Sequence, residues 1–122
     1  MGKLYYFAHP LTARDSCGNR SEEREYLNYL NSLQRTAKLL SLGYNVISPI
    51  PHSYKINEEL KKLRIEDYGW YSLDNEMIEK TNFNGIILAP NWESSFGCRE
   101  EKKKFEEKGL EVLLYEDIVK DN

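Results

Sequence analysis

The chain has 122 residues, the size of one ordinary domain. Hydrophobic residues make up 40% and charged residues 30%, a balance that excludes disordered and fibrous proteins. A formal net charge of -3 argues against binding to a nucleic-acid polymer, because such binding needs a basic surface. No apolar run approaches the roughly 20 residues of a membrane span and no signal-peptide pattern is visible, so we expect a cytoplasmic protein without a membrane partner.

Apolar segments alternate with helical patterns, beginning with a predicted strand over Lys3–Ala8, which is rich in aromatic residues. After a polar loop, hydrophobic residues recur at three- and four-residue spacing over Leu27–Leu40, which predicts a long helix. Asn19 or Ser21 can cap the start of this helix, and Gly43 is expected to end it.

The alternation continues to the end of the chain. The remaining predictions are a strand over Tyr44–Ser48, a short helix near Asn57–Leu63, a helix over Tyr68–Lys80, a strand over Gly85–Ala89, a charged helix ending at Gly109, a strand over Glu111–Tyr115 and a short tail. Short strands that are apolar on both faces and separated by helices predict an α/β fold with a parallel sheet covered on both sides. Ligands of such sheets bind beyond the carboxyl ends of the strands.

Candidate site residues are therefore sought in the segments that follow the strands, and the segment after Ala89 is the most informative. Ser95 can cap a helix there, Gly97 allows close approach to the backbone, and free N–H groups at the helix start suit an anion. Glu101 lies within the first two turns and is suited to act as a nucleophile or base. The alternative is that Ser95 is only a cap and Glu101 only a surface residue.

Asp74 is a second candidate, because cleavage of a glycosidic bond commonly uses two carboxyl groups. The alternative for Asp74 is an exposed helix residue. Tyr5 and Tyr6 point to opposite faces of the first strand, and either can be plain core. His52 is expected near the mouth of the cleft, although a loop histidine is more often solvated.

A zinc site is not expected. The only cysteines and histidines are scattered along the chain and lack the paired spacing of zinc ligands. These residues are Cys17, Cys98, His9 and His52.

Four short motifs occur in succession between residue 4 and about residue 115. They are Tyr6-Phe-Ala8-His9-Pro10, Ser48-Pro-Ile-Pro-His52-Ser53, Trp70-Tyr-Ser-Leu-Asp74 and Asn91-Trp92-Glu-Ser-Ser95-Phe-Gly97-Cys-Arg-Glu-Glu101. In this order they resemble the nucleoside 2-deoxyribosyltransferase-like superfamily, and within it an uncharacterised bacterial and phage branch related to nucleoside 5′-monophosphate N-glycosidases. The chain departs from that branch at Asn91, commonly Gly there, and at Asn84, where relatives often have Asp.

The resemblance implies one domain over residues 1–122, a flavodoxin/Rossmann-like three-layer sandwich with a parallel sheet of four to five strands. It implies that Glu101 attacks the anomeric carbon, that Tyr6 positions this glutamate, and that Asp74 binds sugar or base and assists protonation of the leaving group. The residues that it implies for substrate binding are Ala8, His9, Pro10, His52, Trp92, Ser95 and Gly97.

The residue at position 95 bears on the substrate. In relatives that hydrolyse nucleoside 5′-monophosphates a serine contacts the phosphate, whereas base-exchanging transferases resemble one another in having aspartate. Ser95 therefore favours hydrolysis of a nucleoside 5′-monophosphate, and Arg14, Arg20 and Arg24 can supply further charge or be solvated.

Two alternatives stay open: a nucleoside 2-deoxyribosyltransferase that exchanges bases, and a non-catalytic nucleotide-binding module. The expected partner is a small-molecule nucleoside or nucleotide. The chemistry needs no metal or organic cofactor. Because relatives complete their sites across a dimer interface, we expect a homodimer or a higher homo-oligomer.

Overall fold

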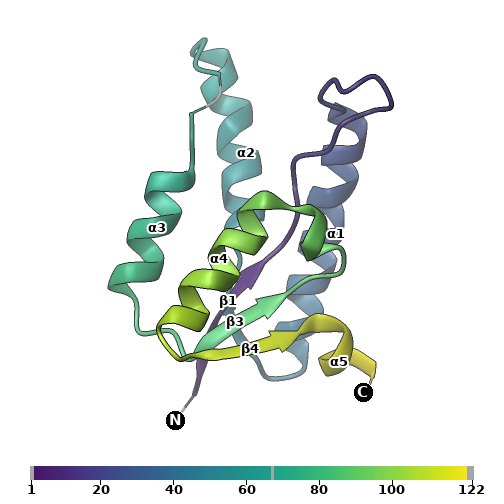
Figure 1. Ribbon diagram of the computed structural model, residues 1–122. Coiled ribbons are helices and arrows are strands. Elements are labelled where there is room, and N and C mark those ends of the chain that lie inside the picture. The colour runs from purple at the N-terminus through teal and green to yellow at the C-terminus, as the bar shows by residue number, and fades with distance from the viewer. Residues whose placement is uncertain (1, 67, 121–122) are drawn as a thin grey trace.

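The computed structural model describes residues 2–66 and 68–120, whose four strands form one parallel sheet (Figure 1). The strands are β1 (Leu4–Ala8), β2 (Asn45–Ile47), β3 (Gly85–Leu88) and β4 (Glu111–Leu114), in the spatial order β2-β1-β3-β4. All three pairings are parallel, and Tyr6 at the centre lies between Ile47 and Ile86. The predicted α/β class with a parallel sheet of four strands is confirmed.

The helices are α1 (Glu22–Ser41), α2 (Pro49–Lys62), α3 (Tyr71–Lys80), the 3₁₀ turn η1 (Trp92–Ser94), α4 (Phe96–Glu107) and α5 (Tyr115–Lys120). Helix α1 has the expected ends. The Ser21 side chain caps it by accepting a hydrogen bond from the Arg24 backbone N–H at 3.3 Å. Gly43 follows it with a φ of 90°, a left-handed conformation that glycine adopts without strain.

Two sequence predictions were wrong. Helix α2 begins at Pro49 and not near Asn57, and both Pro49 and Pro51 lie in its first turn. The N–H groups of that turn have no partner within a helix, so proline is tolerated there. The expected tail after β4 is instead the helix α5, which buries Ile118 against the sheet.

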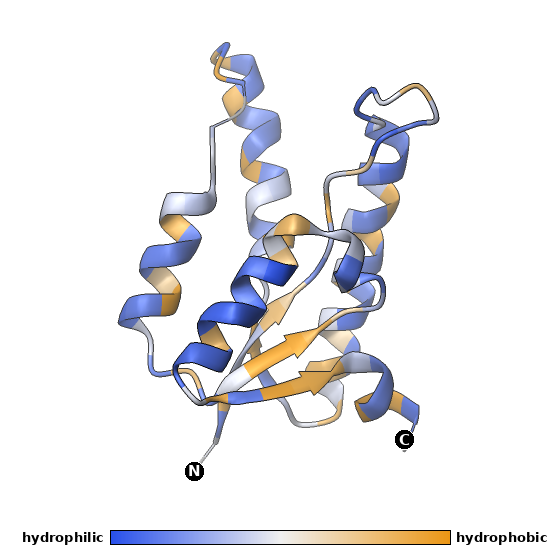
Figure 2. Ribbon diagram, in the orientation of Figure 1, coloured by the Kyte–Doolittle hydropathy of each residue, from blue (hydrophilic) through white to orange (hydrophobic). Residues whose placement is uncertain are grey.

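The sheet is the middle of three layers, because successive side chains of β1 point to opposite faces. Tyr6 and Ala8 pack with residues of α3 and α4, whereas Tyr5 and Phe7 pack with residues of α1 and α5. Figure 2 shows strands that are mainly hydrophobic and helices in which mainly hydrophilic residues alternate with hydrophobic ones. The predicted flavodoxin/Rossmann-like sandwich is therefore the observed architecture.

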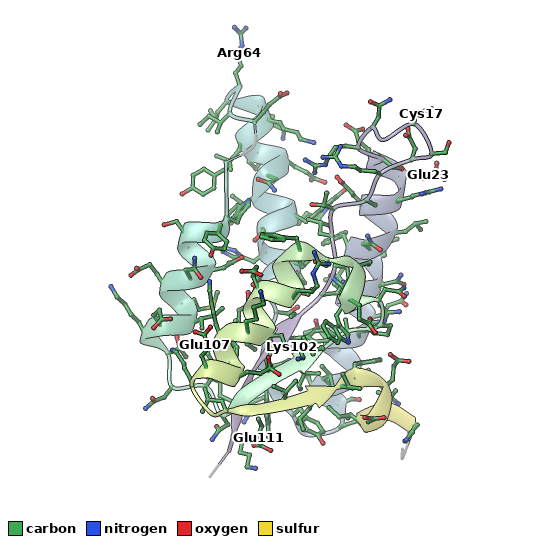
Figure 3. The ribbon with its side chains drawn as sticks, viewed as in Figure 1. Cys17, Glu23, Arg64, Lys102, Glu107 and Glu111 are labelled. Carbon is green, nitrogen blue, oxygen red and sulfur yellow. The ribbon has the colours of Figure 1, made fainter. Side chains whose placement is uncertain are left out.

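The strand order changes direction at β1. The chain passes from β1 to β2 on one side and later returns to β3 on the other side of β1. The carboxyl ends of β1 and β3 therefore flank the position where such sheets bind ligands. Helix α2 and the loop before α1 extend beyond this edge, and Arg64 and Cys17 mark their two tips (Figure 3). No helix within the described ranges is long and apolar enough to cross a membrane.

Candidate active site

A cavity of about 1010 Å³ opens beyond the carboxyl ends of β1 and β3. Its walls come from the segments after these strands and from α1, the start of α2, α3 and the start of α4. The topology of the sheet thus brings residues far apart in sequence to one place. Of the residues singled out from the sequence, His9, Pro10, Asp74, Ser95, Gly97 and Glu101 line this cavity.

Tyr6 and Glu101 form a hydrogen-bonded pair at the base of the cavity. Tyr6 is 1% exposed, and its hydroxyl donates to Oε2 of Glu101. Burial raises the pKa of Tyr6 well above its ordinary value, so this hydroxyl stays a donor. Oε1 of Glu101 has no hydrogen-bond partner among the described residues, and the side chain lines the cavity. The pair therefore holds a carboxyl group with one oxygen fixed and the other available to a ligand.

The environment of Glu101 opposes ionisation. Burial raises the pKa of Glu101 to about 7, and the nearby carboxyl of Asp74 raises it further, while the hydrogen bond from Tyr6 and the charge of Lys104 act in the opposite direction. Strongly shifted carboxyl groups in a cavity are typical of acid–base and nucleophilic sites.

Asp74 lies on α3 and faces the same cavity. Its Oδ1 atom is shielded from solvent and has no hydrogen-bond partner among the described residues. Burial raises the pKa of Asp74 to about 6, although the charges of His52 and Lys104 oppose this shift. Because the charge of Asp74 raises the pKa of Glu101, the two titrate as a pair that retains about one proton between pH 6 and 7.

The start of α4 forms the wall beside this carboxyl pair. Ser95 caps the helix, and its Oγ accepts a hydrogen bond from the Cys98 N–H at 3.2 Å. The first N–H groups of any helix lack partners within it, which makes this wall suitable for an anion. A Cβ atom added at Gly97 would meet only Ser95 Oγ, at 3.9 Å. The backbone at Gly97 is therefore open to close approach from the cavity.

Both departures from the resembling branch have a structural reason. Asn91 has a φ of 66°, in the left-handed region that asparagine tolerates better than most other non-glycine residues. Asparagine therefore permits the turn from β3 into η1. Asn84 accepts a hydrogen bond from the Leu4 N–H through Oδ1 at 2.8 Å. An aspartate would offer the same type of acceptor.

The sequence did not indicate that His9 contacts Arg35 or that Arg35 lines the cavity. His9 is 5% exposed, with Nδ1 2.8 Å from the Pro10 carbonyl oxygen and Nε2 2.9 Å from Nη1 of Arg35. Arg35 comes from α1, far along the chain, and lines the cavity. No motif indicates Arg35, because only the packing of α1 against the sheet brings it to His9.

Lys104 was interpreted from the sequence as part of the solvated face of a helix, although its spacing from Glu101 carries a signal. It lies three residues after Glu101 on α4, and residues three apart share one helix face. Its Nζ lies 4.5 Å from the centre of the Tyr71 ring, and it lines the cavity.

Several other sequence candidates do not line this cavity. Ala8 is buried in the core on the α4 side of the sheet, and Trp92 packs at its margin, with Lys102 Nζ 5.4 Å from its ring centre. His52 is exposed and meets the edge of Trp70 at 5.8 Å. Arg20 forms an ion pair with Glu25 at 2.6 Å, whereas Arg14 and Arg24 line the cavity.

The two cysteines are in different environments. Cys17 is exposed in the loop before α1, whereas Cys98 is buried beneath α4. Within residues 2–66 and 68–120, no group of three or more His, Cys, Asp or Glu side chains is placed to hold a metal ion.

No curated protein matches this chain. The model of the family described as "Domain of unknown function (DUF1937)" matches residues 3–117, a range that contains all four strands and every residue lining the cavity. The chain therefore belongs to the DUF1937 family.

Proposed function

We propose that this protein hydrolyses the N-glycosidic bond of a nucleoside 5′-monophosphate through a covalent intermediate on Glu101. The observation that carries the proposal is the buried carboxyl pair: Glu101 hydrogen-bonded to Tyr6, beside Asp74 with an unpartnered oxygen, in an open cavity. Two carboxyl groups that share a proton supply both a nucleophile and an acid.

In the first step, Oε1 of Glu101 attacks C1′ of the sugar while the bond from C1′ to the base nitrogen breaks. The base leaves with the electron pair of that bond and receives a proton from Asp74. This step needs an ionised Glu101 and a protonated Asp74, which is the less populated of the two singly protonated states because Glu101 has the higher pKa. Tyr6 positions the nucleophile by holding Oε2.

In the second step, Asp74 accepts a proton from water, whose oxygen attacks C1′ and breaks the ester bond to Glu101. Sugar phosphate is released, Glu101 is again a carboxylate and Asp74 is again protonated, so the cycle closes without a cofactor. A carboxylate nucleophile divides one difficult displacement into two easier ones.

The walls of the cavity supply contacts for the rest of the substrate. Ser95 precedes Glu101 by six residues, about 9 Å along a helix, a separation suited to a phosphate on the far side of a pentose. Trp70, Tyr71 and Asn75, from α3 and the residue before it, also line the cavity. Aromatic faces and an amide are suited to stacking and hydrogen bonding with a base.

The test is to incubate the protein with purine and pyrimidine nucleosides and their 5′-monophosphates, with and without an acceptor base, and to measure products by chromatography. The control variants are Glu101→Gln and Glu107→Gln. The second removes the same charge from the exposed end of α4, where Glu107 lies away from the cavity (Figure 3).

We expect free base and sugar phosphate from the wild type and Glu107→Gln, and none from Glu101→Gln. A new nucleoside formed only with acceptor base present would instead identify a transferase. Thermal stabilisation by a nucleotide without any product would identify a binding module and contradict catalysis.

A further inference from the structure

The geometry points to Arg35, held in place by His9, as the residue that selects a phosphorylated ligand over the corresponding nucleoside. This inference rests on the proposed function for the position of the sugar. It adds a specificity-determining residue from α1 and gives His9 a positioning role in place of direct substrate binding.

The hydrogen bonds of His9 define its tautomer. Arginine has donors only, so Nε2 of His9 accepts the 2.9 Å hydrogen bond from Arg35 Nη1. Nδ1 therefore carries the proton and donates to the Pro10 carbonyl oxygen at 2.8 Å. Burial lowers the pKa of His9 to about 4, so the ring stays neutral and remains an acceptor near neutral pH.

Arg35 carries a charge that no carboxylate within residues 2–66 and 68–120 balances by an ion pair. Its guanidinium carbon lies 5.9 Å from the centre of the Tyr115 ring. The contact with His9 uses one donor, and a guanidinium group has five. A half-buried arginine fixed in orientation, with unused donors in a cavity, is suited to bind a phosphate through two hydrogen bonds.

The carboxyl pair and Arg35 come from different sides of the sheet, and Lys104 lies on the side of the carboxyl pair. Glu101 and Asp74 lie on α4 and α3, which cover one face of the sheet, whereas Arg35 lies on α1, which covers the other. Arg35 and Glu101 line the same cavity at the carboxyl ends of β1 and β3, so the inference places the sugar of the ligand at Glu101 and its phosphate toward Arg35. A negatively charged group at that position complements the charge of Arg35.

The other arginines of the cavity wall are engaged differently. Arg24 Nη1 donates to the Arg14 carbonyl oxygen at 2.9 Å, and Arg14 Nη1 donates to the Gly18 carbonyl oxygen at 2.9 Å. Both side chains are exposed; Arg24 ties the loop before α1 to the helix, and Arg14 makes its bond within that loop. Arg35 is therefore the best oriented of the three for recognition.

The first experiment measures binding by calorimetry in the Glu101→Gln background, which prevents turnover. The probes are AMP, GMP, CMP and UMP, their four nucleosides, and inorganic phosphate. Arg35→Ala is compared with Lys38→Ala, which removes the same charge from an exposed position on the same helix. Arg35→Lys tests whether charge alone is sufficient.

We expect Arg35→Ala to weaken binding of the preferred monophosphate by about 100-fold and its nucleoside by less than about 2-fold. Lys38→Ala should change neither affinity by more than about 2-fold, and Arg35→Lys should fall in between. If Arg35→Ala still prefers the monophosphate over the nucleoside, the inference is overturned. It is also overturned if the Glu101→Gln protein with Arg35 intact binds neither the monophosphates nor inorganic phosphate.

The second experiment tests the positioning role of His9 in the active protein. His9→Phe removes the acceptor for Arg35 but retains an aromatic ring beside Phe7, and His9→Gln retains an acceptor. We expect His9→Phe to raise KM for the monophosphate about 10-fold with little change in kcat, and His9→Gln to restore part of the loss. Equal losses in kcat for nucleoside and nucleotide would contradict a positioning role, and thermal unfolding checks that both variants fold.

The outcomes separate this inference from the proposed function. Loss of monophosphate preference in Arg35→Ala, in a protein that releases no base, supports Arg35 recognition and contradicts hydrolysis. Release of base by the wild type, with the preference intact in Arg35→Ala, supports hydrolysis and overturns the role of Arg35.

Discussion

Tyr5 and Tyr6 are adjacent on β1, and each donates a hydrogen bond to a glutamate, yet the two glutamates differ in their acidity. Tyr5 bonds to Glu111 at 3.1 Å, and Lys3 contacts the same Oε1 atom at 3.1 Å. The hydrogen bond from Lys3, followed by that from Tyr5, lowers the pKa of Glu111. Burial instead raises the pKa of Glu101 to about 7 beside Tyr6. The difference in pKa between the two glutamates therefore comes from the exposure of Glu111 and its neighbour Lys3, since both glutamates accept a hydrogen bond from a tyrosine.

This difference indicates what a carboxyl group needs in order to act chemically. Glu111 is exposed and its oxygen is already shared by two donors, so it stabilises the amino end of the sheet. Glu101 is held by one donor beside a cavity, with its second oxygen unoccupied.

The largest expected effect is that of Glu101→Ala, which should lower kcat/KM for base release by about 10³-fold or more because it removes the nucleophile. Sodium azide should restore part of the rate and give a glycosyl azide, because a small anion can occupy the vacated position. Glu111→Ala should retain activity within about 2-fold. Chromatography with mass spectrometry measures all three; a Glu101→Ala rate near that of the wild type would exclude the proposed nucleophile.

Asp74→Asn should lower kcat by about 10²-fold or more, because the amide cannot protonate the leaving base. The wild-type rate should peak between pH 6 and 7, where the pair carries one proton, and fall on both sides. The variant should lose the fall on the alkaline side. Glu76→Gln is the matched control, since Glu76 is exposed on the same helix and paired with Lys80 at 2.8 Å. A profile unchanged by Asp74→Asn would refute its role as the acid.

Tyr6→Phe should lower kcat/KM by about 10-fold or more, because Glu101 loses the donor that positions it. That donor also lowers the pKa of Glu101, which is the higher of the two, so the alkaline side of the rate profile should move to higher pH in the variant. Tyr5→Phe should change neither the rate nor the profile. Steady-state rates from pH 5 to 9 compare Tyr6→Phe with Tyr5→Phe. Equal effects of the two variants would contradict a special role for the hydrogen bond from Tyr6 to Glu101.

The smallest expected effect concerns stability. The folded-state pKa of Glu101, about 7, exceeds its ordinary 4.5, so the folded state binds more protons between these values and loses stability as the pH rises. Glu101→Gln cannot ionise and should be more stable than the wild type at pH 8 by about 1–2 kcal/mol, allowing for solvent screening. Below pH 4.5 the difference should vanish.

Glu111→Gln should behave in the opposite way. The lowered pKa of Glu111 stabilises the wild type above the ordinary pKa, so this variant should be less stable at pH 8, and the difference should disappear in acid. Thermal unfolding at pH 8 and pH 4 measures both variants. A Glu101→Gln variant that is less stable than the wild type at pH 8 would show that ionised Glu101 is well accommodated.

The fold could be predicted from local patterns because strand and helix periodicities are properties of short segments. The aromatic run before Ala8 and the spacing of apolar residues over α1 identified their elements with nearly the right ends. The start of α2 could not be found in this way, because a proline directly after the predicted strand over Tyr44–Ser48 suits the end of a strand as well as the start of a helix, and the structure uses Pro49 to begin a helix. Rules that use only neighbouring residues are ambiguous where a proline can either end a strand or begin a helix.

For the site, the sequence by itself determined which residues follow each strand and which side chains share a helix face. It therefore placed Ser95, Gly97 and Glu101 together at the start of one helix. The bond from Tyr6 to Glu101 was implied only by the family resemblance and by no local pattern, and tertiary structure alone decided that His9 holds Arg35. The physical reason is that these partners lie on separate elements, and their meeting depends on strand order, helix packing and burial, which no local pattern contains.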